Sequence, residues 1–559
     1  MEKNAPVIWL LKRVRRHLPA LFALTTTHIG ESVLAVAFAL GSRGVIDGAV
    51  SGDPEVFRRA CLIQGGIILG ILLCQTIYRH LKERLAADLD RTWKRDLLHG
   101  LLHGEYDEVT AYHSGELINR LNNDVRVVDE GIVNALPNAV YMVVKVMAAF
   151  VALASMEPHF AVLLIGAGAA VVAATALLRG RLKALNKQVS QADGKVSGFL
   201  QETLEKLLMV QAMDAADEME RRADRLLEER YILQRRRRNV SLFANISVSV
   251  MSYAAGFSAL VWCAFKLLHG QMSFGSLTAV TQLVSQLQAP FVNLSAVIPQ
   301  YIAMTAAAER LMELEEISGE ADQLKNDGQK LYDDMTALAA DGLRFSYDRD
   351  VVLQNGAFLL PKGTFTVISG PSGVGKSTLL KLMLGIFRPD AGRLYLKTTA
   401  GEVQLDRSSR GLFAYVPQSN LLLSGTLREN LTITCPNATE EEIAQAVYTA
   451  AMEDYLAQLP HGLDTELGES GAGLSEGQAQ RLAIARAVLG GAPVLLLDEV
   501  TSALDEETER TVLTRIRELP RRTCIAVTHR PAALELADLE LKVSGQEMQV
   551  RRIRKTVQF

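Results

Sequence analysis

The sequence predicts two consecutive domains: an all-α domain of six membrane-spanning helices and, after it, an α/β domain of the phosphate-loop type. Long apolar runs occur up to about residue 310, whereas the rest of the chain has the mixed composition of an ordinary α/β domain. There, a glycine-rich loop at residues 370–377 follows an apolar strand, and the acidic pair Asp498 and Glu499 follows another. A chain of 559 residues is long enough for two or more domains.

Charge and cysteine content exclude other classes of protein. The net charge of −4 argues against a nucleic-acid partner, because nucleic-acid phosphates require a strongly basic protein surface. The five cysteines are scattered, and none has the CxxC spacing of a metal site. We therefore expect reduced, buried thiols instead of a disulfide framework.

Six segments are long and apolar enough to cross a bilayer, whose hydrocarbon core of ~30 Å needs about 20 mainly apolar helical residues. An even number of crossings returns the chain to the side on which it started. The predicted spans cover residues 17–48, 58–80, 131–156, 159–180, 241–267 and 273–305.

The distribution of basic residues predicts the orientation of these spans. Residues 79–130 and 179–240 form long connections rich in Lys and Arg, whereas the connections on the other side are short. Because basic connections stay in the cytoplasm, we expect the N-terminus and the second domain to be cytoplasmic and the protein to lie in the plasma membrane. The expected division is a membrane domain at 1–315, a charged linker at 316–338 and a nucleotide-binding domain at 339–559.

Polar residues inside the predicted spans are candidates for a substrate pathway. Glu31 and Lys145 lie near the middle of two spans, where a charge costs about 2.5–3.5 kcal/mol. They face either a central pathway or a buried structural partner. Gln282, Gln286 and Asn293 fall close to one face of the sixth span, where they either line a cavity or form hydrogen bonds between helices.

The glycine-rich loop has the context that a phosphate-binding loop requires. Residues 365–369 are a β-branched, apolar strand, and the residues after Ser377 have helical character. The glycines let the backbone approach phosphates at a helix N-terminus, Lys376 can reach the β- and γ-phosphates, and the Ser377 hydroxyl can bind Mg²⁺. The predicted nucleotide-binding residues of this loop are Gly370, Ser372, Gly373, Gly375, Lys376, Ser377 and Thr378.

The acidic pair completes a site for phosphoryl transfer. Residues 494–497 are continuously apolar, as in a parallel strand buried on both faces. Asp498 ends this strand, where open α/β sheets bind ligands, and suits the Mg²⁺ shell. Glu499 is placed to polarise an attacking water, so we expect it to be catalytic. An acidic pair at this position can also act only as a helix cap.

Residues 340–540 resemble the nucleotide-binding domain of ABC transporters, and the whole chain resembles an exporter-type half-transporter. The resemblance implies an all-α six-helix transmembrane domain followed by an α/β P-loop ATPase domain with an α-helical signature subdomain, and ATP and Mg²⁺ as cofactors. The weaker matches are Thr465-Glu466-Leu467-Gly468-Glu469 and the 115–124 segment, which are similar to segments typical of exporters.

The resemblance also assigns roles to single residues. Tyr347 matches the aromatic residue that stacks on adenine, Gln418 the glutamine that senses Mg²⁺ and the γ-phosphate, and His529 the switch histidine, which is expected to be catalytic with Glu499. Ser502 and Asp505 belong to the loop that communicates across the dimer. The signature is Leu474-Ser475-Glu476-Gly477-Gln478, with Glu476 where the family usually has Gly.

The family resemblance implies a dimer that moves a substrate. Ser475, Gly477 and Gln478 are expected to contact ATP bound to the phosphate loop of a second half-transporter, in a homodimer or a heterodimer. ATP binding and hydrolysis would drive alternating access in the lipid bilayer, with export of an unidentified substrate as the favoured direction. The alternatives are an importer of a metal-chelator complex and an ATP-gated channel or regulator.

Overall fold

The computed structural model describes residues 5–317, 327–347, 350–419, 422–468, 473–544 and 547–553. Within the helices, the side chains at 165, 167, 169–179, 183, 244, 245, 248 and 289–298 lie outside this description. The chain forms two compact units: a helical unit made of residues 1–99 and 114–316, and a nucleotide unit made of residues 100–113 and 317–559. Each unit is described by itself below.

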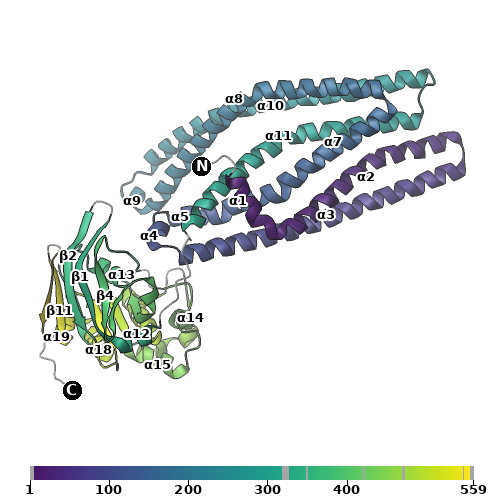
Figure 1. Ribbon diagram of the computed structural model, residues 1–559. Helices are drawn as coiled ribbons and strands as arrows, with labels where there is room; N and C mark the ends of the chain where they lie inside the picture. Colours follow the sequence, from purple (N-terminus) through teal and green to yellow (C-terminus); the bar gives the residue numbers. More distant parts are fainter. Residues whose placement is uncertain are drawn as a thin grey trace. The chain divides into compact units, whose positions relative to one another are not determined.

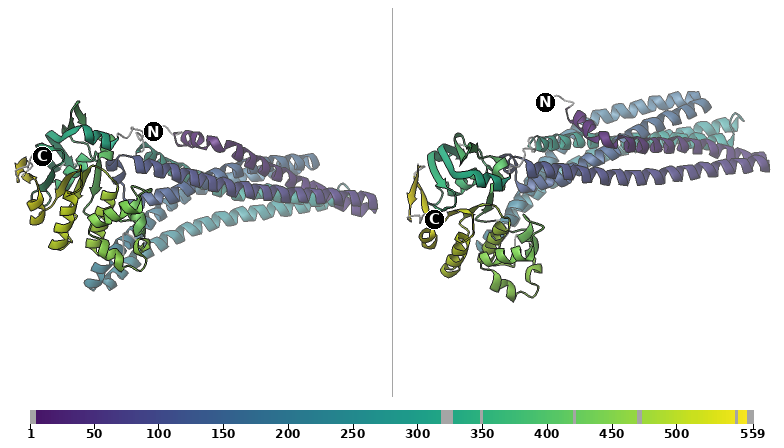
Figure 2. Two further views of the ribbon diagram at one scale, coloured as in Figure 1. Left: turned by 90° about the horizontal axis from the view of Figure 1, so that it is seen from below. Right: turned by 60° about the horizontal axis from the view of Figure 1, so that its bottom comes forward.

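The helical unit consists of long helices, of which α8 packs along α10 and α2 packs along α7 (Figures 1 and 2). Pro158 occupies the first turn of α8, where its missing N–H costs nothing. The helices are α1 (Ala5–Val14), η1 (Arg15–His17), α2 (Leu18–Ser51), α3 (Pro54–His103), α5 (Ser114–Asn119), η2 (Arg120–Asp124), α6 (Val125–Glu130), η3 (Gly131–Ala135), α7 (Leu136–Met156), α8 (Pro158–Glu205), α9 (Leu207–Ala212), α10 (Ala216–Leu268) and α11 (Phe274–Ile317).

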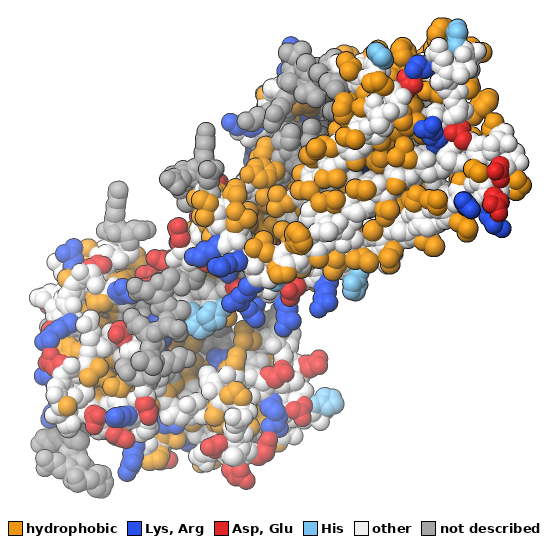
Figure 3. Space-filling view, turned by 45° about the vertical axis from the view of Figure 1, so that its right-hand side comes forward, with side chains coloured by type: hydrophobic (Ala, Val, Ile, Leu, Met, Phe, Trp, Pro, Cys, Tyr) orange, Lys and Arg blue, Asp and Glu red, His pale blue; other side chains and the backbone are white. Residues whose placement is uncertain are grey.

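Four of these helical stretches are long and apolar enough to cross a membrane when only the described residues are considered. They are Ala5–Ser51, Pro54–His103, Ser114–Met156 and Ser249–Leu268. The predicted spans at 159–180 and 273–305 lie in the continuous helices α8 and α11, but part of each falls on side chains outside the description. Hydrophobic side chains gather over the surface of the long helices in Figure 3, as expected for a lipid-facing surface.

Outside the predicted spans, ion pairs hold the segment before α7 to α11. Arg310 donates two hydrogen bonds to Asp124, at 2.8 and 2.6 Å, and Asp124 is only 1% exposed. Arg120 donates to Glu313 at 2.9 Å and to the carbonyl oxygen of Arg310. Both Arg120 and Asp124 lie in η2, a π-helical turn, a form that appears in short pieces and often at functional sites.

The nucleotide unit contains two larger sheets and a two-stranded ribbon. The six-stranded sheet has the order β12-β11-β3-β10-β9-β6, parallel except for the edge strand β12, and the four-stranded antiparallel sheet has the order β2-β1-β4-β5. The strands are β1 (Met335–Tyr347), β2 (Asp350–Pro361), β3 (Phe365–Ser369), β4 (Ala391–Thr398), β5 (Gly401–Gln404), β6 (Phe413–Val416), β7 (Gly425–Thr426), β8 (Glu466–Leu467), β9 (Val494–Asp498), β10 (Thr523–Val527), β11 (Leu539–Ser544) and β12 (Glu547–Arg552).

Helices cover these sheets, and several of them begin at a capping residue. Thr426 and Thr439 each form a capping box with a glutamate three residues later, which satisfies two backbone donors at the helix start. The helices are α4 (Tyr106–Thr110), α12 (Gly328–Asp334), α13 (Lys376–Met383), η4 (Arg407–Leu412), α14 (Leu427–Thr432), α15 (Glu440–Thr449), α16 (Glu453–Gln458), η5 (Gly462–Asp464), α17 (Glu476–Leu489), α18 (Glu506–Arg517) and α19 (Pro531–Leu536).

Candidate nucleotide-binding site

The predicted phosphate loop joins the buried strand β3 to α13. Gly370 has φ 151°, and a Cβ atom there would lie 2.1 Å from the carbonyl oxygen of Val543, so only glycine fits. Gly375 has φ 99° and begins α13. The Lys376 ammonium donates to the carbonyl oxygens of Gly370 and Pro371, both at 2.9 Å, so it lies inside the loop. This loop therefore presents a helix N-terminus and a lysine to the same small space.

Asp498 and Ser377 supply oxygen atoms of the kind that Mg²⁺ prefers in proteins, and they lie side by side. The Ser377 hydroxyl donates to one carboxylate oxygen of Asp498 at 2.9 Å, and the Tyr415 hydroxyl donates to the other at 3.1 Å. Burial of Asp498 raises the pKa of its carboxyl group, while these two hydrogen bonds oppose that rise. A buried carboxylate with a hydroxyl beside it fits a divalent cation, so the residues present suit the predicted Mg²⁺ site.

Glu499 lies next to the metal-binding pair and contacts the predicted sensor glutamine. The Gln418 amide donates to the Glu499 carboxylate at 2.9 Å. Glu499 has φ 52°, an uncommon left-handed conformation for a glutamate, and its N–H donates to the carbonyl oxygen of Val527 at 3.0 Å. His529 is exposed and follows β10, the strand beside β9. The predicted catalytic residues therefore follow adjacent parallel strands.

The predicted adenine-stacking residue lies beside the same loop. Tyr347 is the last residue of β1, is 40% exposed, and its hydroxyl lies 3.3 Å from the Thr378 hydroxyl oxygen. Its ring packs edge-on against Phe345 and Phe387, at centroid distances of 5.0 and 5.5 Å. These two phenylalanine rings hold the Tyr347 ring in place, and much of the Tyr347 ring remains accessible to a ligand.

The signature residues begin α17. Ser475 caps this helix: its hydroxyl accepts from the Gln478 N–H at 3.3 Å, and the Gln478 side chain accepts from the Ser475 N–H at 2.8 Å. A Cβ at Gly477 would lie 2.9 Å from the carbonyl oxygen of Ala503, which explains the glycine. Asp505 caps α18 by accepting from the Thr508 N–H at 2.9 Å.

Three residues that the sequence reasoning missed connect these motifs. The Tyr415 hydroxyl donates a hydrogen bond to Asp498. The only sequence pattern that pointed to Tyr415 was its place beside the buried Val416 in β6. Gln480 is 1% exposed and donates to the Ser502 hydroxyl at 3.0 Å. Arg530 donates to the Leu504 carbonyl oxygen at 2.7 Å, joining the residue after His529 to the 502–505 loop. No spacing rule in the sequence indicates the last two contacts.

The two predicted charged residues of the spans do not pair with each other among the described contacts. Glu31 contacts the His28 imidazole at 3.1 Å and accepts from the Gln75 amide at 3.0 Å. His28 itself is stacked between the rings of Tyr78 and Tyr141, with centroid distances of 4.2 and 3.9 Å. A polar, aromatic cluster from α2, α3 and α7 therefore surrounds Glu31.

Lys145 lies one helical turn from this cluster. Its ammonium donates to the Tyr141 hydroxyl at 3.0 Å. On α11, the Gln286 amide donates to the Ala35 carbonyl oxygen at 2.7 Å, the inter-helix bond expected as one alternative. Side-chain oxygens of Gln282 and Gln286 are buried without a partner in the part of the chain that the structure describes. The side chain of Asn293 lies outside the described residues.

Comparisons with known proteins identify the family. A model of the ABC transporter transmembrane region matches residues 21–291, and a model described as ABC transporter matches residues 353–502. An ATP-dependent lipid A-core flippase of Chromobacterium violaceum is 30% identical over 502 residues, which cover 88% of this chain and 85% of the relative. The chain belongs to the ABC transporter family. It is an ATP-driven, multi-pass membrane transporter with an ATPase domain.

Other relatives share the same architecture. A mycobactin import ATP-binding/permease protein of Mycolicibacterium thermoresistibile is 32% identical over 394 residues, covering 68% of this chain and 66% of that protein. The structure of a bacterial Atm1-family ABC exporter with ATP bound superposes with a TM-score of 0.78 at 23% identity, covering 96% and 95% of the two chains. The predicted fold is thereby confirmed as that of an exporter-type half-transporter, a fold that implies dimerisation.

Proposed function

We propose that this ABC transporter is an ATP-driven exporter of the plasma membrane that works as a dimer of half-transporters. The observation that carries the ATPase part is the convergence of Lys376, Ser377, Asp498 and Glu499 at the ends of β3 and β9. Both strands belong to one parallel sheet, so these groups lie at one edge of it.

We assign the following roles. Lys376 and the backbone N–H groups of the loop bind the β- and γ-phosphates, and Tyr347 stacks on adenine. Ser377, Asp498 and Gln418 would hold Mg²⁺, which would supply positive charge next to the phosphates. Glu499 orients and polarises the attacking water, and His529 contacts the γ-phosphate. Phosphoryl transfer depends mainly on such positioning and charge neutralisation.

The dimeric part of the proposal rests on the signature helix. Ser475 and the first turn of α17 present a capped helix N-terminus, which is suited to an anionic ligand. We propose that this helix start, with Gly477 and Gln478, binds ATP held by the phosphate loop of the second half-transporter. Ser502 and Asp505 would then lie at the interface between the two nucleotide-binding domains. The second chain is either identical or a related half-transporter.

Coupling to transport is supported by the path of the chain. The segment from Gly100 to His113, which includes α4, is part of the nucleotide unit, although α3 and α5 on either side belong mainly to the helical unit. Within the nucleotide unit, the Tyr106 ring packs against Phe387 at 5.8 Å, and Arg388 pairs with Glu105. A movement of the nucleotide unit would therefore pull on both α3 and α5.

The substrate pathway is proposed to include Glu31, Lys145, Gln282, Gln286 and Asn293, with at least one of the two charged residues facing it. The test is transport and substrate-stimulated ATP hydrolysis by Glu31→Gln and by Lys145→Met in vesicles. Each substitution removes one charge while keeping most of the side-chain volume. If both variants retain normal transport and stimulation, these two charges have only a structural role.

The proposed orientation places the N-terminus and the nucleotide unit in the cytoplasm, following the basic connections between the spans. Import is the second candidate, because the mycobactin import protein is among the relatives. Inside-out vesicles distinguish the two directions: export predicts ATP-dependent accumulation of substrate inside them, whereas import predicts its release.

The decisive experiment measures transport and ATP hydrolysis in the same vesicles. A compound panel that stimulates ATP hydrolysis identifies a substrate, and Glu499→Gln serves as the variant that binds ATP without turnover. We expect accumulation of the substrate against its gradient by the wild type and none by Glu499→Gln. Substrate that only equilibrates across the membrane while ATP is present would instead support an ATP-gated channel.

A further inference from the structure

The loop at residues 502–505 joins the end of β9 to α18. Within it, the Ser502 N–H donates to the Glu499 carbonyl oxygen at 3.2 Å, and the Leu504 N–H donates to the Thr501 carbonyl oxygen at 3.1 Å. These short-range bonds shape the turn, but they do not fix where it lies relative to the rest of the nucleotide unit. Two side chains from other parts of this unit bind the loop and do fix its place.

Arg530 binds the loop from the side of the predicted switch histidine. Its guanidinium donates to the carbonyl oxygen of Leu504 at 2.7 Å and to that of Ser502. A guanidinium is planar and presents its N–H groups in a fixed geometry, so one side chain can hold two carbonyl oxygens at once. Arg530 follows His529 directly in the chain, so a single residue joins His529 to the loop.

A buried carboxylate fixes the orientation of Arg530. Glu509 accepts from the Arg530 guanidinium at 3.2 Å and from the Thr501 hydroxyl at 2.8 Å. The side chain of Glu509 is only 2% exposed, and a carboxylate buried to this extent requires such partners. Because Glu509 holds the guanidinium in place, the N–H groups of Arg530 are directed at the carbonyl oxygens of the loop.

Gln480 binds the same loop from the signature helix α17. Its amide N–H donates to the Ser502 hydroxyl at 3.0 Å, and its amide oxygen accepts from the Ala503 N–H at 3.2 Å. Gly477, one turn earlier on α17, allows the close approach, since a Cβ there would lie 2.9 Å from the Ala503 carbonyl oxygen. The loop is therefore bonded to the helix that begins beside Ser475.

We propose that Arg530 and Gln480 are positioning residues for ATP hydrolysis, which hold the 502–505 loop in the place from which it serves the dimer. The proposal rests on the proposed ATP-hydrolysing dimer and adds two residues that act through the loop. Arg530 ties the loop to the histidine of one ATP site, and Gln480 ties it to the helix start that meets the other. Their polar groups bind the loop, so their loss should lower turnover and leave MgATP affinity nearly unchanged.

Steady-state hydrolysis of MgATP by the full-length protein in detergent tests the role of Arg530. Arg530→Met should lower kcat at least about tenfold, because misplacing a supporting group by about 1 Å can cost as much as about 100-fold. The affinity for MgATP, measured by equilibrium binding, should stay within about twofold, since the phosphate loop is untouched.

Arg517→Met is the matched control. Arg517 also binds a carboxylate, that of Asp538 at 2.9 Å, and a backbone carbonyl oxygen, that of Leu536. The exposed fractions of the two arginine side chains are 31% for Arg517 and 33% for Arg530. The bonds of Arg517 lie outside the 502–505 loop, so its loss should change kcat by less than about twofold.

A double-mutant cycle tests whether Arg530 and Gln480 act through one loop. Gln480→Met keeps an unbranched side chain of similar length but removes both hydrogen bonds. If either loss releases the same loop, Arg530→Met combined with Gln480→Met should lower kcat no further than the stronger single variant, whereas independent sites multiply their losses. Arg530→Lys keeps the charge beside Glu509, so it should restore the thermal midpoint; its ammonium lacks the planar fork, so kcat should stay low.

Thermal unfolding checks that each variant is folded, and Arg530→Lys replaces Arg530→Met in the cycle if the latter is not. Equal losses of kcat in Arg530→Met and Arg517→Met, multiplied losses in the double variant, or full recovery of kcat in Arg530→Lys would overturn the positioning role. Hydrolysis by the wild type that Glu499→Gln abolishes supports the proposed ATPase separately. Its absence in the wild type would overturn the proposed function itself, and this role with it.

Discussion

Polar side chains are arranged differently in the two units. In the nucleotide unit, the chemically important groups lie at the carboxyl ends of parallel strands of one sheet: Gly370 to Ser377 follow β3, Asp498 ends β9 and Glu499 follows it. In the helical unit, charged residues meet where two long helices pass each other, as Asp124 and Arg310 do. The position of a residue at a sheet edge follows from the strand order, whereas the point at which two helices cross depends on the packing of every residue between them.

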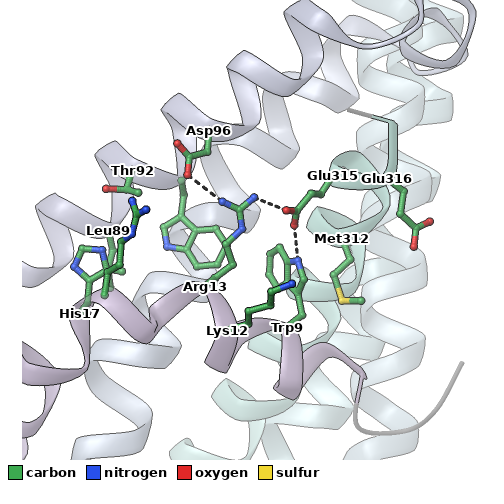
Figure 4. A pocket seen from close by; sticks show the side chains of 12 residues that line it. Trp9, Lys12, Arg13, His17, Leu89, Thr92, Asp96, Met312, Glu315 and Glu316 are labelled. Atoms are coloured by element: carbon green, nitrogen blue, oxygen red, sulfur yellow. Dashed lines mark hydrogen bonds and ion pairs between the residues drawn. The ribbon is translucent and has the colours of Figure 1, made fainter. Parts of the chain in front are cut away.

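This difference separates charged residues that are available to bind a ligand from charged residues that hold helices together. In the nucleotide unit, Lys376 contacts only backbone carbonyl oxygens of its own loop among the described residues, so its charge remains available to phosphates. In the helical unit, Arg13 and Arg310 each form ion pairs with carboxylates on other helices. Arg13, for example, lies between Asp96 and Glu315 in Figure 4. Four substitutions test this contrast, and they follow in order of expected effect.

The largest effect is expected from Lys376→Ala. Loss of the only side-chain cation inside the phosphate loop should lower ATP hydrolysis by a factor of at least about 100, as for other groups that stabilise transferred charge. Steady-state hydrolysis of MgATP by the purified protein measures this. Lys381→Ala, on the same helix but outside the loop, is the control and should cost much less. Equal losses in both variants would contradict the role of Lys376.

Arg310→Met is expected to destabilise the helical unit by about 3 kcal/mol, because it leaves the buried carboxylate of Asp124 without its partner. Thermal unfolding in detergent should show a lower midpoint. The control is Arg126→Met, which breaks an exposed pair with Glu130 at 3.9 Å and should change stability by less than about 1 kcal/mol. If the two variants unfold alike, the Asp124 pair does not hold these helices together.

Tyr415→Phe should shift the pH dependence of MgATP binding. Burial already raises the pKa of Asp498, and the Tyr415 hydroxyl favours its charged form. Without that hydroxyl the pKa rises further, so a proton competes with Mg²⁺ up to a higher pH. The half-maximal pH of MgATP binding should move upward by about one pH unit. An unchanged or lowered midpoint would show that Tyr415 does not stabilise the carboxylate.

The smallest effect is expected at the signature serine. Ser475→Ala removes the cap of α17 and should cost about 1 kcal/mol of stability, whereas Ser475→Gly should cost only a few tenths. Both variants lose the hydroxyl that is proposed to contact ATP on the second chain. Equal reductions of ATP hydrolysis with unequal thermal midpoints would separate that contact from the cap. Hydrolysis that follows stability alone would leave Ser475 with only the capping role.

Most of the nucleotide site was predictable because each motif is local. The glycine loop needs three glycines near a strand end, and the observed φ values of Gly370 and Gly375 give the reason. Gln418 and Glu499 were identified singly, but their hydrogen bond joins residues 81 positions apart and depends on β6 lying beside β9. The contacts of Tyr415 and Arg530 were missed for the same reason.

In the helical unit, prediction from sequence reached the helices but not their contacts. Glu31 and Lys145 were identified from the sequence as charges within predicted spans, yet neither His28 nor Tyr141 was foreseen as a partner. The periodicity of a long apolar helix indicates which residues avoid water, but many rotations about its axis bury the same apolar area. The observed rotation brings His28 between two tyrosine rings.

The sequence by itself determined that this protein spans a membrane, binds ATP and belongs to the exporter-type half-transporters, because hydropathy and short motifs act over a few neighbouring residues. Only the tertiary structure decided which distant groups meet: Ser377 with Asp498, Arg310 with Asp124, and Arg13 with both Asp96 and Glu315. The physical reason is the distance along the chain over which each kind of interaction acts. Backbone conformation and burial are set locally, whereas a hydrogen bond between residues 83 or more positions apart, such as Arg13 and Asp96, exists only after the whole unit has packed.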